Sequence, residues 1–398
     1  MGRGVAYSTT EAAHLLNVRA EGMSAWAGEP GHFARRFEAE GGHGRGFAQR
    51  RFFAKYLGEL LSGATDSGCT ELAEATAVSA IRDDDGWKVG FDDGSSVEAA
   101  ALVLAVGNQE PEGLAAFAGI GRRFVGNPWG EVARAAVEEL AASGGAALIV
   151  GTGLTMVDLV LSLEAVGHQG RVVALSRRGL SPRAHADFEP APVDKEALPS
   201  GLRAMFRWLR RRGAQVGWRA AIDSLRPYSH GLWQGLTHEE QRRFLRHARP
   251  WWDVHRHRIA PEVAAIVADM VAAGRLEIVA GRIVAAHETP EGVRVEYRKR
   301  GVAEARSESF AYVFNCTGPL HSISRSKDPL LSSLLGAGEA KPDHLGIGLE
   351  VGGDCRAGPG LWALGPLTKG RYWEIIAVPD IREQAAAVAD DIQRELNG

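Results

Sequence analysis

The segment 146–178 constrains the fold of this chain most, because it combines two apolar runs with a glycine turn and a helical pattern. Residues 146–150 predict a buried strand, and residues 154–166 repeat apolar side chains at helical spacing. A Gly-x-Gly turn separates them, and the apolar run 171–176 predicts a second strand. Strand, Gly-x-Gly, helix and strand in this order form the dinucleotide-binding βαβ unit.

Two glycines and two arginines in this segment predict its ligand. Gly151 permits the tight turn, and Gly153 lets backbone N–H groups approach a pyrophosphate at the positive end of the helix. Enzymes that prefer NAD usually carry an acid at the end of the second strand, whereas Arg177 and Arg178 suit the 2′-phosphate of NADP(H). The alternative is a structural βαβ unit with solvated arginines, since Met156 replaces the usual third small residue. The predicted NADP(H) site comprises Gly151, Thr152, Gly153, Leu154, Thr155, Arg177 and Arg178.

Length and composition set the class of protein. A chain of 398 residues predicts about two domains, and 45% apolar with 24% charged residues is typical of a globular protein. The net charge of −3 gives no reason to expect a nucleic acid or an anionic membrane as a partner. No apolar run is long enough to cross a bilayer, and the first eight residues are too polar for a signal peptide. We therefore expect a cytoplasmic protein that acts on a small-molecule substrate.

Cysteines and histidines give no sign of a disulfide or a metal. Cys69, Cys316 and Cys355 are odd in number and far apart, which argues against a disulfide framework, a cysteine zinc site and a redox-active disulfide. His255 and His257 suggest metal ligands, but no carboxylate or third histidine is placed to complete a site. We expect no metal there; aromatic packing beneath a helical cap is the favoured role, and substrate contact is the second.

One structural pattern occurs twice along the chain. Residues 74–107 and 277–318 each predict a three-stranded meander followed by a buried strand that ends at a glycine. The meander turns contain Asp-Gly or Pro-x-Gly, which favour hairpins. The two glycines at the strand ends are Gly107 and Gly318.

The segment 183–274 has a different character. Arginines crowd residues 203–219 while Leu202, Phe206 and Leu209 keep helical spacing, which predicts an amphipathic helix with a basic face. Thr237 begins a capping box, and Pro261 begins another helix. We expect a mainly helical insertion that caps a substrate cleft.

Six short motifs resemble the FAD/NAD(P)-binding flavoproteins, a family related to flavin-dependent monooxygenases and pyridine nucleotide-dependent oxidoreductases. The resemblance implies an α/β fold with two Rossmann-like domains, parallel sheets and β-meander crossovers, plus the helical insertion. It also implies an FAD-binding domain formed by residues 1–120 and 311–398, with an NADP-binding domain at 121–310 between them. The motifs are residues 2–8, 13–18, 150–158, 175–183, 315–319 and 370–374.

The same resemblance implies a flavin site. It places Asn17 near the flavin, although turn and core packing is an equal alternative, and it places Val78 on the strand that meets the adenine of FAD. Gly107 and Gly318 end the strands that return to the nucleotide-binding sheets. Gly365 and Pro366 precede the helix start that holds the ribityl chain and the pyrimidine edge of the flavin. Arg371, Tyr372, Trp373 and Glu374 follow as candidates to line the active site or to pack locally.

Two departures from the family bear on chemistry. Family members begin with a strand, a Gly-x-Gly-x-x-Gly turn, a helix and a second strand, which hold the ADP half of FAD. Gly2 and Gly4 match the region just after that unit, so we expect either a coding start placed too far downstream or a protein that lacks the unit. The linker 124–129 has no histidine of the kind some related monooxygenases carry, so oxygen activation cannot be inferred from it.

The predicted function is an NADPH-dependent flavoprotein oxidoreductase that passes a hydride from NADPH to FAD and then reduces oxygen or an organic acceptor. The alternative is a non-catalytic or degenerate NADP(H)-binding accessory protein that cannot hold FAD. A flavin-independent reductase is a third, weaker option. No general acid or base can be named from the sequence.

Overall fold

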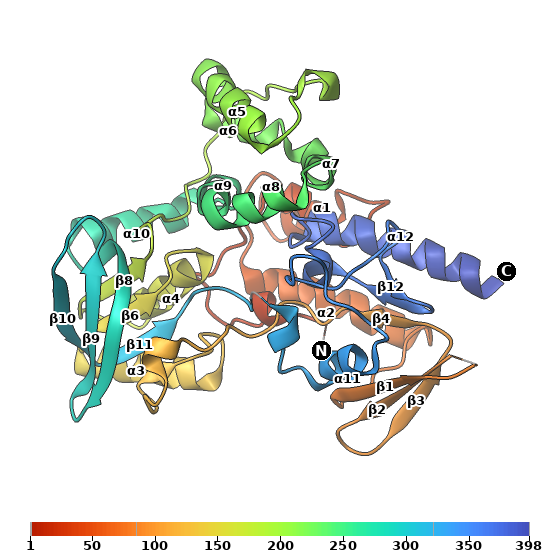
Figure 1. Cartoon of the computed structure of the whole chain (residues 1–398), viewed down its shortest axis with the longest axis horizontal. Helices are drawn as coiled ribbons and strands as arrows, with labels where there is room; N and C mark the ends of the chain where they lie inside the picture. The colour runs from red at the N-terminus through yellow and green to blue at the C-terminus, as the bar shows by residue number, and fades with distance from the viewer. Residues whose placement is uncertain (1, 85, 321, 398) are drawn as a thin grey trace.

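The computed structural model describes residues 2–84, 86–320 and 322–397. Two sheet-based bodies lie side by side, and a helical layer stands above them (Figure 1). No helix in the described part of the chain is both long and apolar enough to span a membrane.

The larger body is a seven-stranded sheet in the order β10-β9-β8-β7-β6-β11-β5. Five neighbouring strands run parallel, namely β5, β11, β6, β7 and β8. Strands β9 and β10 extend the sheet from β8 as an antiparallel meander. The strands are β5 (Phe124–Val125), β6 (Ala147–Val150), β7 (Val172–Ser176), β8 (Leu276–Thr289), β9 (Gly292–Lys299), β10 (Ala305–Phe310) and β11 (Tyr312–Asn315).

Both faces of this sheet are buried, which explains the continuous apolar runs in the sequence. Ala147 and Ile149 face the core shared with α3 (Glu131–Ser143), α4 (Leu154–Ala165) and α10 (Pro261–Ala272). Leu148 and Val150 face the other way and pack against η3 (Ala115–Phe117) and the curled β8–β10 meander. A parallel strand covered on both faces requires apolar residues at every position, as β6 has.

The predicted strand–turn–helix–strand unit is present as β6, α4 and β7. The strand predicted at residues 311–316 is also present, but it is β11, which pairs with β6 and β5. The predicted domain boundary at residue 311 assigned this strand to the second part of the FAD-binding domain. In the structure, β11 belongs to the seven-stranded sheet. Hydrogen bonding to β6 fixes this assignment, because β11 lies between β6 and β5.

The smaller body contains two three-stranded sheets. One is the predicted meander β1 (Ala77–Arg82), β2 (Trp87–Phe91) and β3 (Ser96–Ala99), with α11 (Pro329–Ala337) packed on it. The other has the order β12-β13-β4, in which β4 and β13 run parallel. Its strands are β4 (Leu102–Leu104), β12 (Arg356–Gly358) and β13 (Leu361–Ala363).

The buried strand predicted at residues 101–106 is shorter and more exposed in the structure. Only Leu102–Leu104 form β4, and among the described strands β4 pairs with β13 alone. Val103 is 36% exposed, because β4 is an edge strand. The apolar sequence therefore indicated the strand but not its position at the edge of a sheet.

Residues 2–76 of the described chain form helices and loops. They contain η1 (Val5–Tyr7), η2 (Ala20–Gly22), α1 (His32–Ala39) and α2 (Arg50–Asp66). An aromatic cluster holds this segment together, with Phe33 between Phe53 and Tyr56 at ring distances of 5.0 and 5.1 Å. The C-terminal helix α12 (Val378–Asn397) packs against the β12-β13-β4 sheet through Val388 and Trp362.

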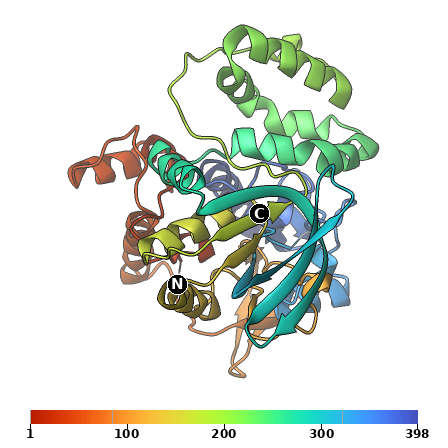
Figure 2. The same cartoon turned by 90° about the vertical axis from the view of Figure 1, so that its left-hand side faces the viewer.

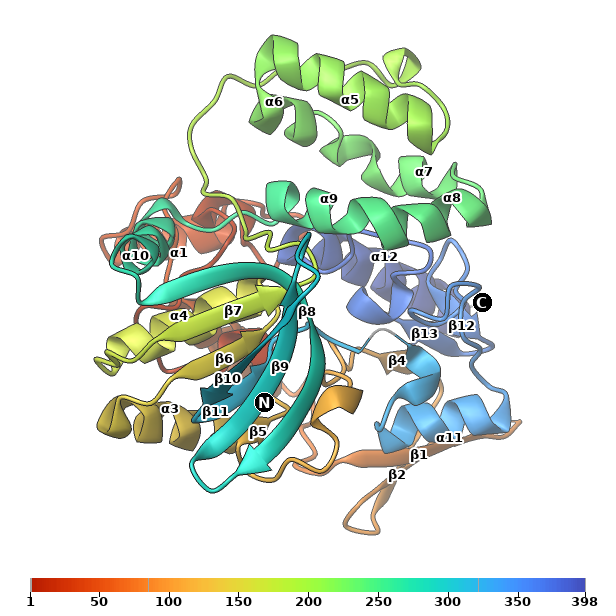
Figure 3. The same ribbon diagram turned by 60° about the vertical axis from the view of Figure 1, so that its left-hand side comes forward.

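The predicted helical insertion is present, but it is shorter than expected, because the helix that begins at Pro261 (α10) packs in the core of the seven-stranded sheet. Figures 2 and 3 show it standing above the sheets, with α5 and α6 farthest from them and α7 to α9 between. Thr237 and Glu240 form the predicted capping box at the start of α8. The elements are η4 (Lys195–Ala197), α5 (Leu202–Val216), α6 (Trp218–Asp223), η5 (Arg226–Tyr228), α7 (Ser229–Gln234), α8 (His238–Arg243), η6 (Phe244–Ala248) and α9 (Arg249–Arg256).

Candidate functional site

The turn between β6 and α4 has the backbone that an anion-binding helix start needs. Gly151 has φ +119°, and a Cβ added there would overlap the carbonyl oxygen of Cys316 at the end of β11. Only glycine allows this close approach. A Cβ added to Gly153 would meet open space, and no side chain caps α4 at this residue. The first N–H groups of α4 are therefore available to a phosphate.

Thr152 and Met156 have roles inside the fold. Thr152 is buried, and its hydroxyl donates a hydrogen bond to the carbonyl oxygen of Leu180 and lies 2.9 Å from the Ser176 Oγ. These contacts hold the loop after β7 beside the turn. Met156 is fully buried in the core beneath the sheet, which explains a large residue where a small one is usual. Leu154 and Thr155, the first two residues of α4, are partly buried.

The two arginines after β7, Arg177 and Arg178, differ in their contacts. Arg178 donates a hydrogen bond from Nη1 to the carbonyl oxygen of His247 in η6, at 2.6 Å. Arg177 is exposed and makes no hydrogen bond or ion pair with any described residue. The strand end therefore offers one free guanidinium group, beside a second that is tied to the helical insertion.

A second group of predicted residues surrounds a small cavity between the two bodies. Gly107, Pro366 and Pro319 line it, so the ends of β4, β11 and β13 meet there. Gly318 directly precedes Pro319, and Gly365 is fixed next to Pro366 by a 2.6 Å hydrogen bond from its N–H to Gln384 Oε1. The cavity has a volume of about 20 Å³, enough for one water molecule.

Lys369 lines the same cavity and was not singled out from the sequence. Its Nζ lies 3.4 Å from Asn108 Oδ1. Burial, together with the charge of nearby Arg249, lowers the pKa of Lys369 to about 8, while Asp253 opposes the shift. Sequence reasoning missed it because Arg249 and Asp253 lie in α9, more than a hundred residues away along the chain. Its place in the turn just after Gly365 and Pro366 was the available signal.

Asn17 and Val78 do not line this cavity. The carbonyl oxygen of Asn17 lies 3.0 Å from Nε2 of His185, so it accepts a hydrogen bond when that nitrogen is protonated. Burial lowers the pKa of His185 to about 4, so the ring is neutral near pH 7. Val78 is partly buried on β1, in the meander. The structure therefore brings together the strand-end glycines but not all the residues that the flavin site was expected to contain.

Glu374 connects the helical insertion to the segment after Gly365. It is only 4% exposed, and its carboxylate accepts a 2.7 Å hydrogen bond from Trp252 Nε1 and pairs with Arg256 Nε at 2.8 Å. His257 is close by, and burial lowers its pKa although Glu374 acts in the opposite direction. His255, for which the sequence led us to expect no metal, contacts the Trp251 carbonyl oxygen at 2.7 Å. Within the described residues, no group of three or more His, Cys, Asp or Glu residues could hold a metal ion.

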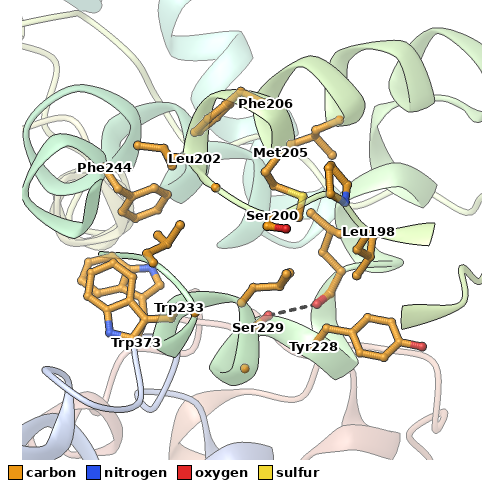
Figure 4. A pocket seen from close by; sticks show the side chains of 18 of the residues that line it. Leu198, Ser200, Leu202, Met205, Phe206, Tyr228, Ser229, Trp233, Phe244 and Trp373 are labelled. Atoms are coloured by element: carbon orange, nitrogen blue, oxygen red, sulfur yellow. Dashed lines mark hydrogen bonds between the residues drawn. The ribbon is translucent and has the colours of Figure 1, made fainter. Parts of the chain in front are cut away.

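A cavity of about 630 Å³ lies inside the helical insertion (Figure 4). Apolar residues of α5, including Leu202 and Phe206, form one wall, and Trp233 and Trp373 lie opposite. Of the predicted segment 371–374, Trp373 and Glu374 reach this cavity. Tyr372 instead donates a hydrogen bond to the carbonyl oxygen of Gly353, at 2.7 Å.

Comparisons with known proteins agree with this arrangement. The FAD-NAD(P)-binding family matches residues 1–109. No curated protein matches the sequence. Among solved structures, the reduced form of ornithine hydroxylase from Pseudomonas aeruginosa is 16% identical, with a TM-score of 0.64, and the match covers 99% of this chain and 89% of that one.

Two further structures are similar to the same degree. L-lysine 6-monooxygenase from Pseudomonas syringae is 19% identical, with a TM-score of 0.62, over 96% of this chain and 87% of that one. Ornithine N-hydroxylase from Kutzneria sp. 744, described with reduced FAD, NADP⁺ and L-ornithine, is 17% identical, with a TM-score of 0.61, over 99% and 90%. The chain thus has the two-domain FAD/NAD(P)-binding fold of flavin-dependent monooxygenases, and its first 109 residues match the FAD-NAD(P)-binding family.

Proposed function

We infer that this protein is an NADPH-dependent flavoprotein oxidoreductase of the monooxygenase type. The observation that carries the inference is the turn between β6 and α4, where Gly151 packs on the Cys316 carbonyl and Gly153 leaves the helix start open. The pyrophosphate of NADPH binds the free N–H groups of α4, and Arg177 pairs with the 2′-phosphate. The likeness of the whole chain to two amino-acid hydroxylases of this fold supports the reaction class.

FAD is the second cofactor of the proposed reaction, and it would supply the hydride acceptor. The types of residue present suit the flavin end of FAD, because Gly107, Pro366 and Lys369 meet where strands from both bodies end. Lys369 holds a proton there that it can release near its pKa of about 8. The fit is incomplete in size, because the cavity has room for one water molecule.

This mismatch favours a second candidate function, an NADP(H)-binding protein without catalysis. The turn between β6 and α4 leaves the helix start open for a phosphate, whereas the space around Gly107 is small. Both functions require NADPH to bind at α4, so they differ only in whether bound NADPH passes its hydride to a flavin.

One experiment separates the two functions. The purified chain is titrated with NADPH, and then FAD is added while the oxidation of NADPH is followed by absorbance. An oxidoreductase binds FAD, shows flavin absorbance after desalting and oxidises NADPH. Binding of NADPH without retained flavin or turnover supports the accessory protein, and turnover without flavin supports the third option. Failure to bind NADPH contradicts all three.

A further inference from the structure

Within the described part of the chain, no element fully buries the apolar face of α5. Leu202, Met205, Phe206 and Leu209 follow one another at helical spacing and line the cavity of the insertion. None of the residues of α5 is buried. A helix with such a face is normally packed against a core, because exposed apolar surface is unfavourable. The face of α5 instead borders a space of about 630 Å³.

The opposite wall is aromatic and firmly packed. Trp233 stacks on Trp373 at a centroid distance of 5.1 Å, and Phe244 meets Trp373 edge to face at 5.4 Å. Trp233 is also held by a 2.8 Å hydrogen bond from its Nε1 to the Gly370 carbonyl oxygen. Figure 4 shows these rings at one end of the cavity and Leu198 and Tyr228 at the other. The cavity is therefore an apolar space with a rigid aromatic group at one end.

Two charged residues line the cavity, and they are not equivalent. The charge of Glu374 is compensated by its ion pair with Arg256, so Glu374 offers no free charge to a ligand. Lys195 is exposed, and it belongs to η4, in the same stretch as Leu198. A polar ligand group would therefore be favoured at the Lys195 end and an apolar group at the tryptophan end.

The surroundings of the cavity are strongly basic. Residues 194–219 contain two acids, Asp194 and Glu196, which flank Lys195, against seven basic residues, which are Lys195, Arg203, Arg207, Arg210, Arg211, Arg212 and Arg219. Arg203, Arg207 and Arg210 are exposed and form no ion pair with the described residues. Uncompensated positive charge next to an apolar cavity attracts an anion with an apolar body.

We propose that this cavity binds a single-chain amphipathic carboxylate, such as a fatty acid or an aryl-substituted acid. The apolar body lies between α5 and the Trp233–Trp373 pair, and the carboxylate lies near Lys195. A volume of this size is typical of sites for small organic ligands. That the ligand is also the organic acceptor of the reaction rests on the proposed function; binding itself does not.

The test measures binding of dodecanoate to the purified chain without nucleotide, by calorimetry and by the fluorescence of the tryptophans that line the cavity. Dodecanoate is compared with dodecanol and with dodecyltrimethylammonium, which share its chain but not its charge. Saturable binding of dodecanoate, stronger than that of the alcohol and much stronger than that of the cation, is expected. No binding of dodecanoate, or equal binding of the cation, overturns the proposal.

Two variants with a matched control locate the site. Met205→Trp fills the cavity and should weaken dodecanoate binding by at least about tenfold. Ala214→Trp adds the same ring to an exposed position of α5 outside the cavity lining, and binding should not change. Lys195→Gln should weaken the binding of dodecanoate by only about threefold, because an ion pair between Lys195 and the carboxylate is exposed to solvent. The binding of dodecanol should not change. An unchanged affinity in Met205→Trp overturns the proposal.

NADPH affinity and circular dichroism are measured on the same samples. They report whether each variant is folded, and they separate the two proposals. Dodecanoate binding without NADPH binding contradicts the proposed function alone. NADPH binding without dodecanoate binding contradicts the carboxylate site alone.

Discussion

Arg50 and Asp158 form a buried, bidentate ion pair that joins α2 to α4. The Nη1 and Nη2 groups of Arg50 donate to the two carboxylate oxygens of Asp158 at 2.9 and 2.8 Å, and its Nε donates to the Leu15 carbonyl oxygen at 3.0 Å. Arg50 is 8% exposed, so it has neither a surface role nor a free group for a cofactor. His14 adds a contact of 2.9 Å to the Asp158 carbonyl oxygen. The N-terminal segment is thereby fixed to the helix whose start is the proposed phosphate site.

Removal of one partner of this pair should destabilise the fold strongly. Arg50→Met leaves the Asp158 carboxylate buried without a counter-ion, and the free energy of unfolding should fall by about 3–5 kcal/mol. Urea denaturation measures this change. Arg51→Met removes the neighbouring exposed arginine and should change the free energy by no more than about 0.5 kcal/mol. Equal effects of the two substitutions would show that the ion pair is not structural.

Arg177 should decide the preference for NADPH over NADH. Arg177→Ala removes the free guanidinium group and should weaken NADPH binding by about 10- to 100-fold, the range for a hydrogen bond to a charged group. Binding of NADH, which lacks the 2′-phosphate, should not change. Calorimetric titration of both nucleotides checks this, and an equal loss for both would place the 2′-phosphate elsewhere.

The two glycines of the turn should respond differently to the same methyl group. Gly151→Ala overlaps the Cys316 carbonyl oxygen and requires a left-handed backbone, so stability should fall by at least about 2 kcal/mol. Gly153→Ala meets no protein atom, so the protein should remain folded while NADPH binding weakens. Thermal unfolding and NADPH titration on both variants separate the effects. A Gly153→Ala protein with normal NADPH affinity would exclude close approach of the pyrophosphate at this residue.

Lys369 should make the protein more stable at high pH. Its pKa of about 8 lies below the usual value of 10.5, so between these values the unfolded chain binds more protons than the folded protein. Stability from this residue therefore rises as the pH increases from about 8 to 10.5, and the unfavourable charge is fully present below pH 8. Lys369→Met should increase the free energy of unfolding more at pH 7 than at pH 10. Denaturation of both proteins across this range tests it, and parallel curves would contradict the shift.

Local sequence patterns predicted the elements that local rules control. The β6–α4–β7 unit, the meanders and the capping box at Thr237 follow from periodicity and turn chemistry over a few residues. The Arg50–Asp158 pair joins positions 108 residues apart, and no local pattern indicates which buried arginine meets which acid. The surroundings of Lys369 depend in the same way on α9, which packs there only in the folded chain. The face of α5 was predicted, but the sequence could not show that it borders a cavity.

The hydrogen bond from Arg178 to His247 limits how this protein can change its choice of nucleotide. Arg178 is hydrogen-bonded to the helical insertion, whereas Arg177 forms no hydrogen bond or ion pair among the described residues. Under the proposed function, one substitution at position 177 should therefore shift the preference from NADPH to NADH without disturbing the insertion. Divergence in cofactor use within such proteins should concentrate at the first arginine and spare the second.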